Sequence, residues 1–142
     1  MALITTAEKY TNTTQRTELY SDFFVGLDIH PGKKDLARAT NEAAIKRSII
    51  NLLLTDYDER LYQPNLGANL KYLLFEPADG ETLSLMRQQI DTCLSKFEPR
   101  MNVQSLQLET SADEQQIEIT LVFNTVTIPK PITINLILNR VR

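Results

Sequence analysis

Five carboxylate side chains are the candidates for acid–base chemistry in this sequence. Most fall in predicted polar loops or at predicted helix ends, and the set is Asp56, Asp58, Glu59, Glu76 and Glu98. Hydrolysis of a glycosidic bond needs two carboxyl groups that face each other across a sugar cleft, and an apolar environment must raise the pKa of one of them. Nothing in the sequence places any two of these side chains in that way. We therefore predict no catalytic residue among them.

The residue types that act as nucleophiles or metal ligands are scarce. Cys93 is the only cysteine and lies on the apolar face of a predicted helix, where a small buried thiol is expected. His30 is the only histidine, so no second histidine can complete a His-based metal site or catalytic pair. The sequence also lacks a glycine-rich phosphate loop, a GxSxG elbow and an HExxH motif. We predict no enzymatic activity, no metal and no cofactor.

The tripeptide Glu98-Pro99-Arg100 stands where a predicted helix gives way to predicted strands. Proline has no backbone N–H and disfavours helical dihedral angles at the residue before it, so the helix should end at or just before Glu98. The planar guanidinium of Arg100 can bind a carboxylate or several carbonyl groups at once. Two interpretations remain open from the residues alone. The pair is either an internal ion pair at a helix end or a partner-binding group.

Length, composition and charge restrict the class of protein. A chain of 142 residues is sufficient for one domain with a single core. The apolar content of 42% is ordinary for a globular protein, and the net charge of −3 gives no electrostatic footprint for nucleic acid or anionic lipid. The sequence has neither an apolar run of eighteen residues nor a secretory signal pattern. We therefore expect a cytoplasmic protein that binds neither nucleic acid nor membrane.

The part of the chain before Glu98 is predicted to be helical or irregular. Residues 1–20 are rich in threonine and predict a flexible arm. A turn-rich stretch within residues 22–40 predicts a loose hairpin, and Asn41 is a good N-cap for a helix to Leu54. In that helix, Ile50 and Leu54 widen the apolar stripe, which predicts burial on more than one side.

A polar loop with several apolar residues follows the first helix. Residues 55–67 interleave Tyr57, Leu61, Tyr62 and Leu66 with charges, so we expect the loop to be held against the core. Residues 69–75 predict a short helix. From about residue 79 or 82 to Phe97, apolar residues spaced by three and four give the strongest helical signal in the chain.

The part of the chain after Arg100 alternates apolar and polar residues with the period of a β-strand. Strands are expected around residues 105–109, 117–124 and 132–139, with a bulge near Asn124-Thr125. The strand that ends the chain is expected at an edge of the sheet, where it could accept a partner strand. The fold class is therefore α+β. Two main helices pack on a small C-terminal antiparallel sheet, preceded by the hairpin and the arm.

Several motifs in a fixed order resemble one family. They are residues 41–45, residues 48–55, Glu59-Arg60, Pro64-Asn65-Leu66-Gly67, Leu73-Leu74-Phe75-Glu76 and Phe97-Glu98-Pro99-Arg100. Together they resemble the small baseplate wedge protein family of contractile phage tails, which has a counterpart in the type VI secretion baseplate. The resemblance extends from about Asp22 to the C-terminus, so residues 21–142 are expected to form a single wedge domain. Where the family pattern often has glycine before Glu-Arg, this chain has Asp58.

The resemblance implies a structural subunit rather than an enzyme. Glu98, Pro99 and Arg100 resemble the family's signature for docking on the core bundle of larger wedge subunits, and Glu59 and Arg60 are implied as further partner-binding residues. The family's C-terminal strands look like the interlocking domain of the tail sheath protein, which implies that strand exchange starts the sheath. The protein would then occupy the host cytoplasm during assembly and afterwards the tail baseplate of the virion.

Two alternatives remain. Members of the family have been labelled acid lysozymes, so one alternative is a peptidoglycan-degrading, lysozyme-like hydrolase of the tail. The other is a free cytosolic adaptor outside any virion, which composition alone does not exclude.

Overall fold

A computed structural model describes residues 19–24, 26–30, 34–111, 115–126 and 129–140. Contacts within the chain divide it into two compact units, Met1–Asn41 and Glu42–Arg142. Residues 1–18 of the predicted arm lie outside the described residues. The predicted division into an arm and one domain therefore stays a prediction.

The first unit contains the predicted hairpin. Strand β1 (Ser21–Phe23) pairs antiparallel with strand β2 (Arg38–Thr40), with Ser21 opposite Thr40. Asn41 follows β2, and its side-chain oxygen accepts hydrogen bonds from the backbone N–H groups of Leu19 (2.9 Å) and Tyr20 (3.3 Å). The hairpin prediction is therefore confirmed, with short strands and an antiparallel register.

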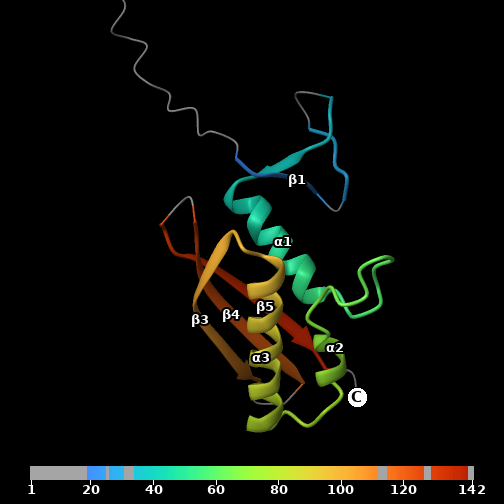
Figure 1. The fold of residues 1–142 in the computed structure, drawn as a ribbon, viewed down its shortest axis with the longest axis vertical. Helices are drawn as coiled ribbons and strands as arrows, with labels where there is room; N and C mark the ends of the chain where they lie inside the picture. Colours follow the sequence, from blue (N-terminus) through green and yellow to red (C-terminus); the bar gives the residue numbers. More distant parts are fainter. Residues whose placement is uncertain (1–18, 25, 31–33, 112–114, 127–128, 141–142) are drawn as a thin grey trace, which may run out of the picture. The chain divides into compact units, whose positions relative to one another are not determined.

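The described residues of the second unit form three helices and a three-stranded antiparallel sheet (Figure 1). The helices are α1 (Glu42–Leu54), α2 (Leu70–Leu73) and α3 (Gly80–Phe97). The strands are β3 (Met101–Thr110), β4 (Gln116–Thr125) and β5 (Ile132–Asn139), in the spatial order β3-β4-β5. Figure 1 shows α3 lying across one face of this sheet. The α+β prediction is confirmed, and β5 lies at a sheet edge as expected.

The core lies between the helices and one face of the sheet. Its largest fully buried side chains come from α1, α3 and β4, and they include Ile45, Ile49, Leu53, Met86, Ile90, Leu94, Ile119, Leu121 and Phe123. Every second residue of β4 from Ile117 to Thr125 is buried. The expectation that α1 is buried on a wider face is only partly correct, because Ile50 is half-buried and Leu54 is exposed.

The bulge is in a different strand from the one predicted. Strand β4 keeps its alternation through Asn124 and Thr125, and Thr125 still pairs with Met101. The register shift lies in β3 between Val103 and Ser105. The prediction was wrong because it counted Val126 as a strand residue, whereas Val126 lies beyond the end of β4 and is exposed.

Helix α3 begins and ends as the sequence predicts. The Asp79 side chain accepts a hydrogen bond from the Thr82 backbone N–H at 2.9 Å, which caps the helix and, with the other hydrogen bonds that the carboxylate accepts, lowers the pKa of Asp79. Glu98 leaves the helical region at φ −128° and ψ 68°, directly before Pro99. Among the described residues, no helix is long and apolar enough to cross a lipid bilayer.

Candidate functional site

Glu98 is a buried carboxylate that binds two other side chains. Arg100 donates from Nε to one Glu98 oxygen at 2.5 Å and from Nη2 to the other at 2.7 Å. The Ser48 hydroxyl donates to the second oxygen at 2.6 Å. The Glu98 side chain is only 3% exposed, whereas that of Arg100 is 37% exposed. We call these three residues the Glu98 clamp.

The clamp joins three elements of the second unit. Ser48 comes from α1, Glu98 follows the last residue of α3, and Arg100 directly precedes β3. The Glu98 backbone N–H donates to Leu94 O at 2.9 Å, which ends the helix, and Arg100 O accepts from Val126 N–H at 3.0 Å, which starts the pairing with β4. Pro99 between them restricts the turn. The geometry therefore fixes the guanidinium relative to both helices and the sheet.

The electrostatics of the clamp keep Glu98 ionised. Burial raises the pKa of Glu98, but the hydrogen bonds from Arg100 and Ser48 and the positive charge of Arg100 outweigh that effect and lower it below the usual value. A carboxyl group with a lowered pKa is a poor general acid at neutral pH. The arrangement is suited to holding a guanidinium in a fixed orientation on a side chain that is 37% exposed.

A polar groove lies beside the clamp. It has a volume of about 400 Å³ and is lined by Asp91, Leu94, Ser95, Glu98, Pro99, Met101, Asn102 and Val103. Pro99 is exposed at its margin. Glu98 and Pro99, which line this groove, directly precede Arg100, so polar side chains from α3 and β3 lie near the clamp.

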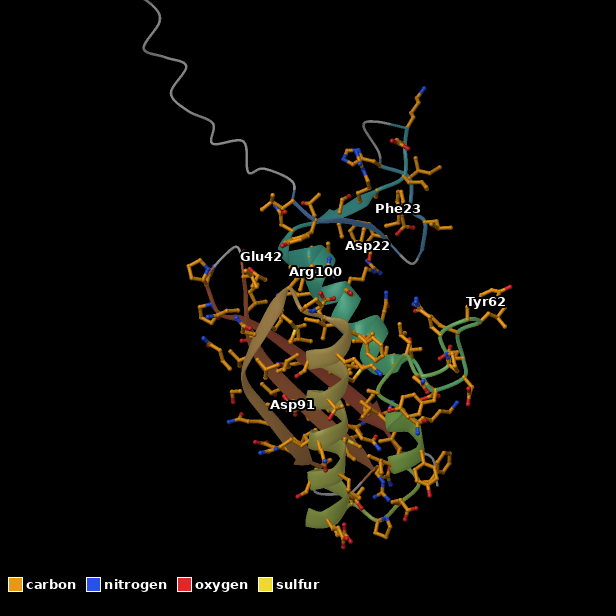
Figure 2. The ribbon with its side chains drawn as sticks, in the orientation of Figure 1. Asp22, Phe23, Glu42, Tyr62, Asp91 and Arg100 are labelled. Atoms are coloured by element: carbon orange, nitrogen blue, oxygen red, sulfur yellow. The ribbon has the colours of Figure 1, made fainter. Side chains whose placement is uncertain are left out.

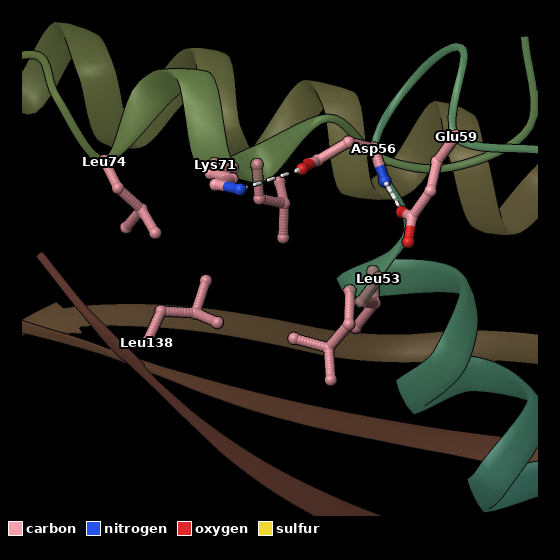
Figure 3. Close-up of a pocket in the computed structure, with 8 residues that line it drawn as sticks. Leu53, Asp56, Glu59, Lys71, Leu74 and Leu138 are labelled. Atoms are coloured by element: carbon pink, nitrogen blue, oxygen red, sulfur yellow. Dashed lines mark hydrogen bonds and ion pairs between the residues drawn. The ribbon is translucent and has the colours of Figure 1, made fainter. Parts of the chain in front are cut away.

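Glu59 and Arg60 belong to a different region, the loop between α1 and α2. The Glu59 carboxylate accepts a hydrogen bond from the Asp56 backbone N–H at 3.0 Å, so it braces its own loop. It also lines a second groove of about 520 Å³, in which Lys71 pairs with Asp56 at 3.9 Å (Figure 3). Arg60 is exposed. The structure does not bring this pair together with the clamp.

The loop is not anchored by its apolar side chains as expected. Leu61 is 87% exposed and Tyr62 is 100% exposed, and Tyr57 is also exposed, so only Leu66 is partly covered. Backbone contacts hold the loop in place, because Asp58 N–H donates to Pro64 O at 2.9 Å. Asp58 has a left-handed φ of 63°, a conformation that glycine adopts more readily, at the position where the family pattern often has glycine.

Arg140 has a structural role that sequence analysis did not find. It follows β5, and its guanidinium donates from Nε to Leu74 O at 3.2 Å and from Nη2 to Glu76 O at 2.6 Å. These carbonyls lie just after α2, where a cation is favourable. The residues are more than sixty positions apart, so no local pattern could have predicted the contact.

Of the other candidates for chemistry, Cys93 and Glu98 are buried, and Asp56 lines the same groove as Glu59. Cys93 is buried, and burial raises the pKa of its thiol to about 11, as expected for a packing residue. Asp56 is paired with Lys71, and Glu98 is held in the clamp. In the part of the chain that the structure describes, no three His, Cys, Asp or Glu side chains form a group that could hold a metal ion.

The sequence profile described as "Baseplate wedge protein gp25" matches residues 39–128 of this chain, which is more than half of its length. The chain belongs to the baseplate wedge protein gp25 family. The matched range includes the whole Glu98 clamp and the loop that carries Glu59 and Arg60, but it ends before β5 and Arg140. The resemblance inferred from the sequence motifs is thereby confirmed.

Relatives and solved structures agree with this assignment. Over 115 aligned residues the chain is 24% identical to baseplate wedge protein gp25 of Enterobacteria phage T4. The alignment covers 81% of this chain and 86% of the relative. A chain in the baseplate of the anti-feeding prophage is 14% identical, with a TM-score of 0.61 and 87% of both chains covered.

Two further structures share the fold. A chain of the postcontracted pyocin R2 baseplate is 17% identical, with a TM-score of 0.57, and covers 69% of this chain and 96% of its own length. A protein from Geobacter sulfurreducens named as a candidate tail lysozyme is 21% identical, with a TM-score of 0.63, and covers 69% of this chain and 89% of its own length. This chain therefore shares its fold with chains from the anti-feeding prophage and pyocin R2 baseplates.

Proposed function

We propose that this baseplate wedge protein docks on the core bundle of larger wedge subunits through the exposed side of the Glu98 clamp. The observation behind the proposal is the difference in burial within one ion pair, because Glu98 is 3% exposed and Arg100 is 37% exposed. The buried carboxylate orients the guanidinium, and its exposed part can bind carbonyl or carboxylate groups of a partner. On this proposal the protein assembles in the host cytoplasm and then remains in the tail.

We propose that the edges of the β3-β4-β5 sheet engage the tail sheath protein and start the sheath. Strands β3 and β5 are both edge strands. Neither strand contains lysine, arginine or proline, the residues that commonly block strand addition at an edge. An extended sheath segment could therefore add to the sheet through backbone hydrogen bonds.

The docking proposal predicts that Arg100→Lys weakens binding to the larger wedge subunits of the same tail by about tenfold to a hundredfold. Lysine keeps a positive charge beside Glu98, so the fold should persist, but it loses the planar fork that binds two acceptors. Binding is measured by co-purification and titration, together with circular dichroism melts. Arg87→Lys on the exposed side of α3 is the matched control and should bind as the wild type does. Equal binding of Arg100→Lys and the wild type would exclude the clamp as the docking site.

We propose further that the protein has no peptidoglycan hydrolase activity, although a structure with the same fold is named as a candidate tail lysozyme. Glu98 has a lowered pKa, and the Glu59 carboxylate accepts a backbone hydrogen bond from its own loop. Purified protein should leave the turbidity of a cell-wall suspension unchanged. Turbidity loss that disappears in Glu59→Gln or Glu76→Gln would establish the hydrolase alternative instead.

A further inference from the structure

The loop between α1 and α2 presents two large apolar side chains to solvent. Leu61 is 87% exposed and Tyr62 is 100% exposed, and exposed Arg60 precedes them. Figure 2 shows Tyr62 at the end of this loop, on a different part of the second unit from Arg100. We call residues 60–62 the loop tip. Tyrosine and arginine are residue types that are enriched at protein-binding hot spots, and the adjacent exposed leucine adds apolar contact area.

The loop tip is held in one conformation by its own backbone. Asp58 N–H donates to Pro64 O at 2.9 Å and closes the loop at its neck. Gln63 N–H donates to Arg60 O at 3.2 Å across the tip itself. A loop that is already ordered loses little conformational freedom when it binds, so more of its contact energy appears as affinity.

Tyr62 has a backbone conformation that bulky residues rarely adopt. Its φ is 69°, in the left-handed region that disfavours side chains with a Cβ. In most loops such a position holds glycine or asparagine. Here the unfavourable conformation directs a tyrosine ring to a place where no other described side chain covers it. Strain of this kind clusters at binding elements.

We propose that the loop tip inserts into a concave, apolar pocket with an acidic rim on another subunit of the baseplate. This inference rests on the proposed function as a wedge subunit. The projecting tip requires a concave partner surface, the leucine and the tyrosine ring require apolar walls, and Arg60 requires a carboxylate at the margin. The loop tip and the Glu98 clamp are then two separate contacts with the assembly, so that each raises the effective concentration of the other.

A second copy of this chain is a poorer partner for the loop tip. The groove of about 520 Å³ has an apolar floor, but Lys71 lines it and would repel Arg60. Its two carboxylates are already engaged, since Asp56 pairs with Lys71 and Glu59 accepts the Asp56 N–H. Another subunit with an unpaired carboxylate therefore fits better.

The test compares a tip variant, Leu61→Ser with Tyr62→Ser, with a control variant, Tyr72→Ser with Phe75→Ser. The control removes two apolar side chains that are each 63% exposed, from α2 and the residues just after it. Each is titrated against the larger wedge subunits of the same tail. We expect at least a tenfold loss of affinity for the tip variant and less than a twofold change for the control. Both should keep the circular dichroism spectrum of the wild type.

A photoreactive benzophenone side chain in place of Tyr62 identifies what the loop tip touches in the assembled complex. A crosslink to an apolar, acidic-rimmed surface of another subunit supports the inference. A crosslink to a second copy of this chain overturns it, as does unchanged binding of the tip variant or an equal loss in the control. If the wild-type protein does not bind wedge subunits at all, the proposed function fails as well. Loss of binding in Arg100→Lys with unchanged binding of the tip variant overturns the inference alone.

Discussion

Replacing Gly67 with alanine is expected to destabilise the second unit by about 4 kcal/mol, a value at the upper end for single substitutions. A Cβ atom at this position would lie 2.2 Å from the backbone oxygen of Thr55 and 2.9 Å from its carbonyl carbon. Both obstacles are backbone atoms, so no side-chain rotation relieves the clash. The φ of Gly67 is also 126°, a conformation that residues with a side chain rarely adopt.

The backbone around Thr55 has little freedom to move away. The Thr55 hydroxyl donates to Asn51 O at 2.6 Å, which ties it to the last turn of α1. Thr55 itself is buried, and Ala68 next to Gly67 is fully buried. The close approach of Gly67 to Thr55 therefore closes the base of the loop, and a larger residue must separate α1 from the start of α2.

Thermal and urea unfolding followed by circular dichroism measure this effect. Gly80→Ala is the matched control, because Gly80 is the first residue of α3 and a Cβ there meets no atom within 4 Å. That variant should gain a few tenths of a kcal/mol, since alanine restricts the unfolded chain. A Gly67→Ala protein as stable as the control would mean that the loop base is not packed as described.

Removal of one partner from the Glu98 clamp is expected to cost more stability than removal of both. In Arg100→Leu the Glu98 carboxylate stays buried, and its one remaining side-chain hydrogen bond is the one from Ser48. The free energy of unfolding should therefore fall by about 3 kcal/mol at pH 7. Arg100→Leu with Glu98→Met replaces the pair by apolar side chains. We expect the double variant to return to within about 1 kcal/mol of the wild type.

The pH dependence has a defined sign. Because the pKa of Glu98 is lower in the folded protein than in the unfolded chain, its stabilising effect is present above the unfolded value of about 4.3 and is lost as the pH falls through the folded value. In Arg100→Leu, burial still disfavours the charged form of Glu98, but the guanidinium that offsets this effect is missing. Protonation of Glu98 at low pH therefore reduces the destabilisation of this variant. The difference in unfolding free energy between the wild type and Arg100→Leu should therefore shrink between pH 7 and pH 4.

The double variant also separates folding from docking. If it folds well but does not bind the larger wedge subunits, the clamp contributes directly to an interface. If the single variant is as stable as the wild type at every pH, the carboxylate is not buried in solution in the way the structure describes.

Ser48→Ala should destabilise the protein less than Arg100→Leu does, because it removes one neutral hydrogen-bond donor, worth about 1 kcal/mol, and leaves the ion pair in place.

The sequence by itself determined most of the elements and, for α3, β4 and β5, the face that each one buries. The spacing of Met86, Ile90 and Leu94 defined α3, and Pro99 defined where that helix ends. The alternation of apolar residues defined β4 and β5. These features are local, because helical and strand periods differ and proline acts on its nearest neighbours. The motifs that identify the baseplate wedge protein gp25 family are also stretches of consecutive residues, so the family could be inferred without coordinates.

The tertiary structure alone decided which of these residues meet. Glu98 and Arg100 were noticed as neighbours in sequence, but only the packing of α1 against the end of α3 brings Ser48 to the same carboxylate and buries it. The contact of Arg140 with the carbonyls after α2 and the exposure of Leu61 and Tyr62 are decided in the same way. Periodicity says that a side chain is apolar and on one face, but it does not say whether another segment covers that face. That depends on long-range contacts, which no local pattern encodes.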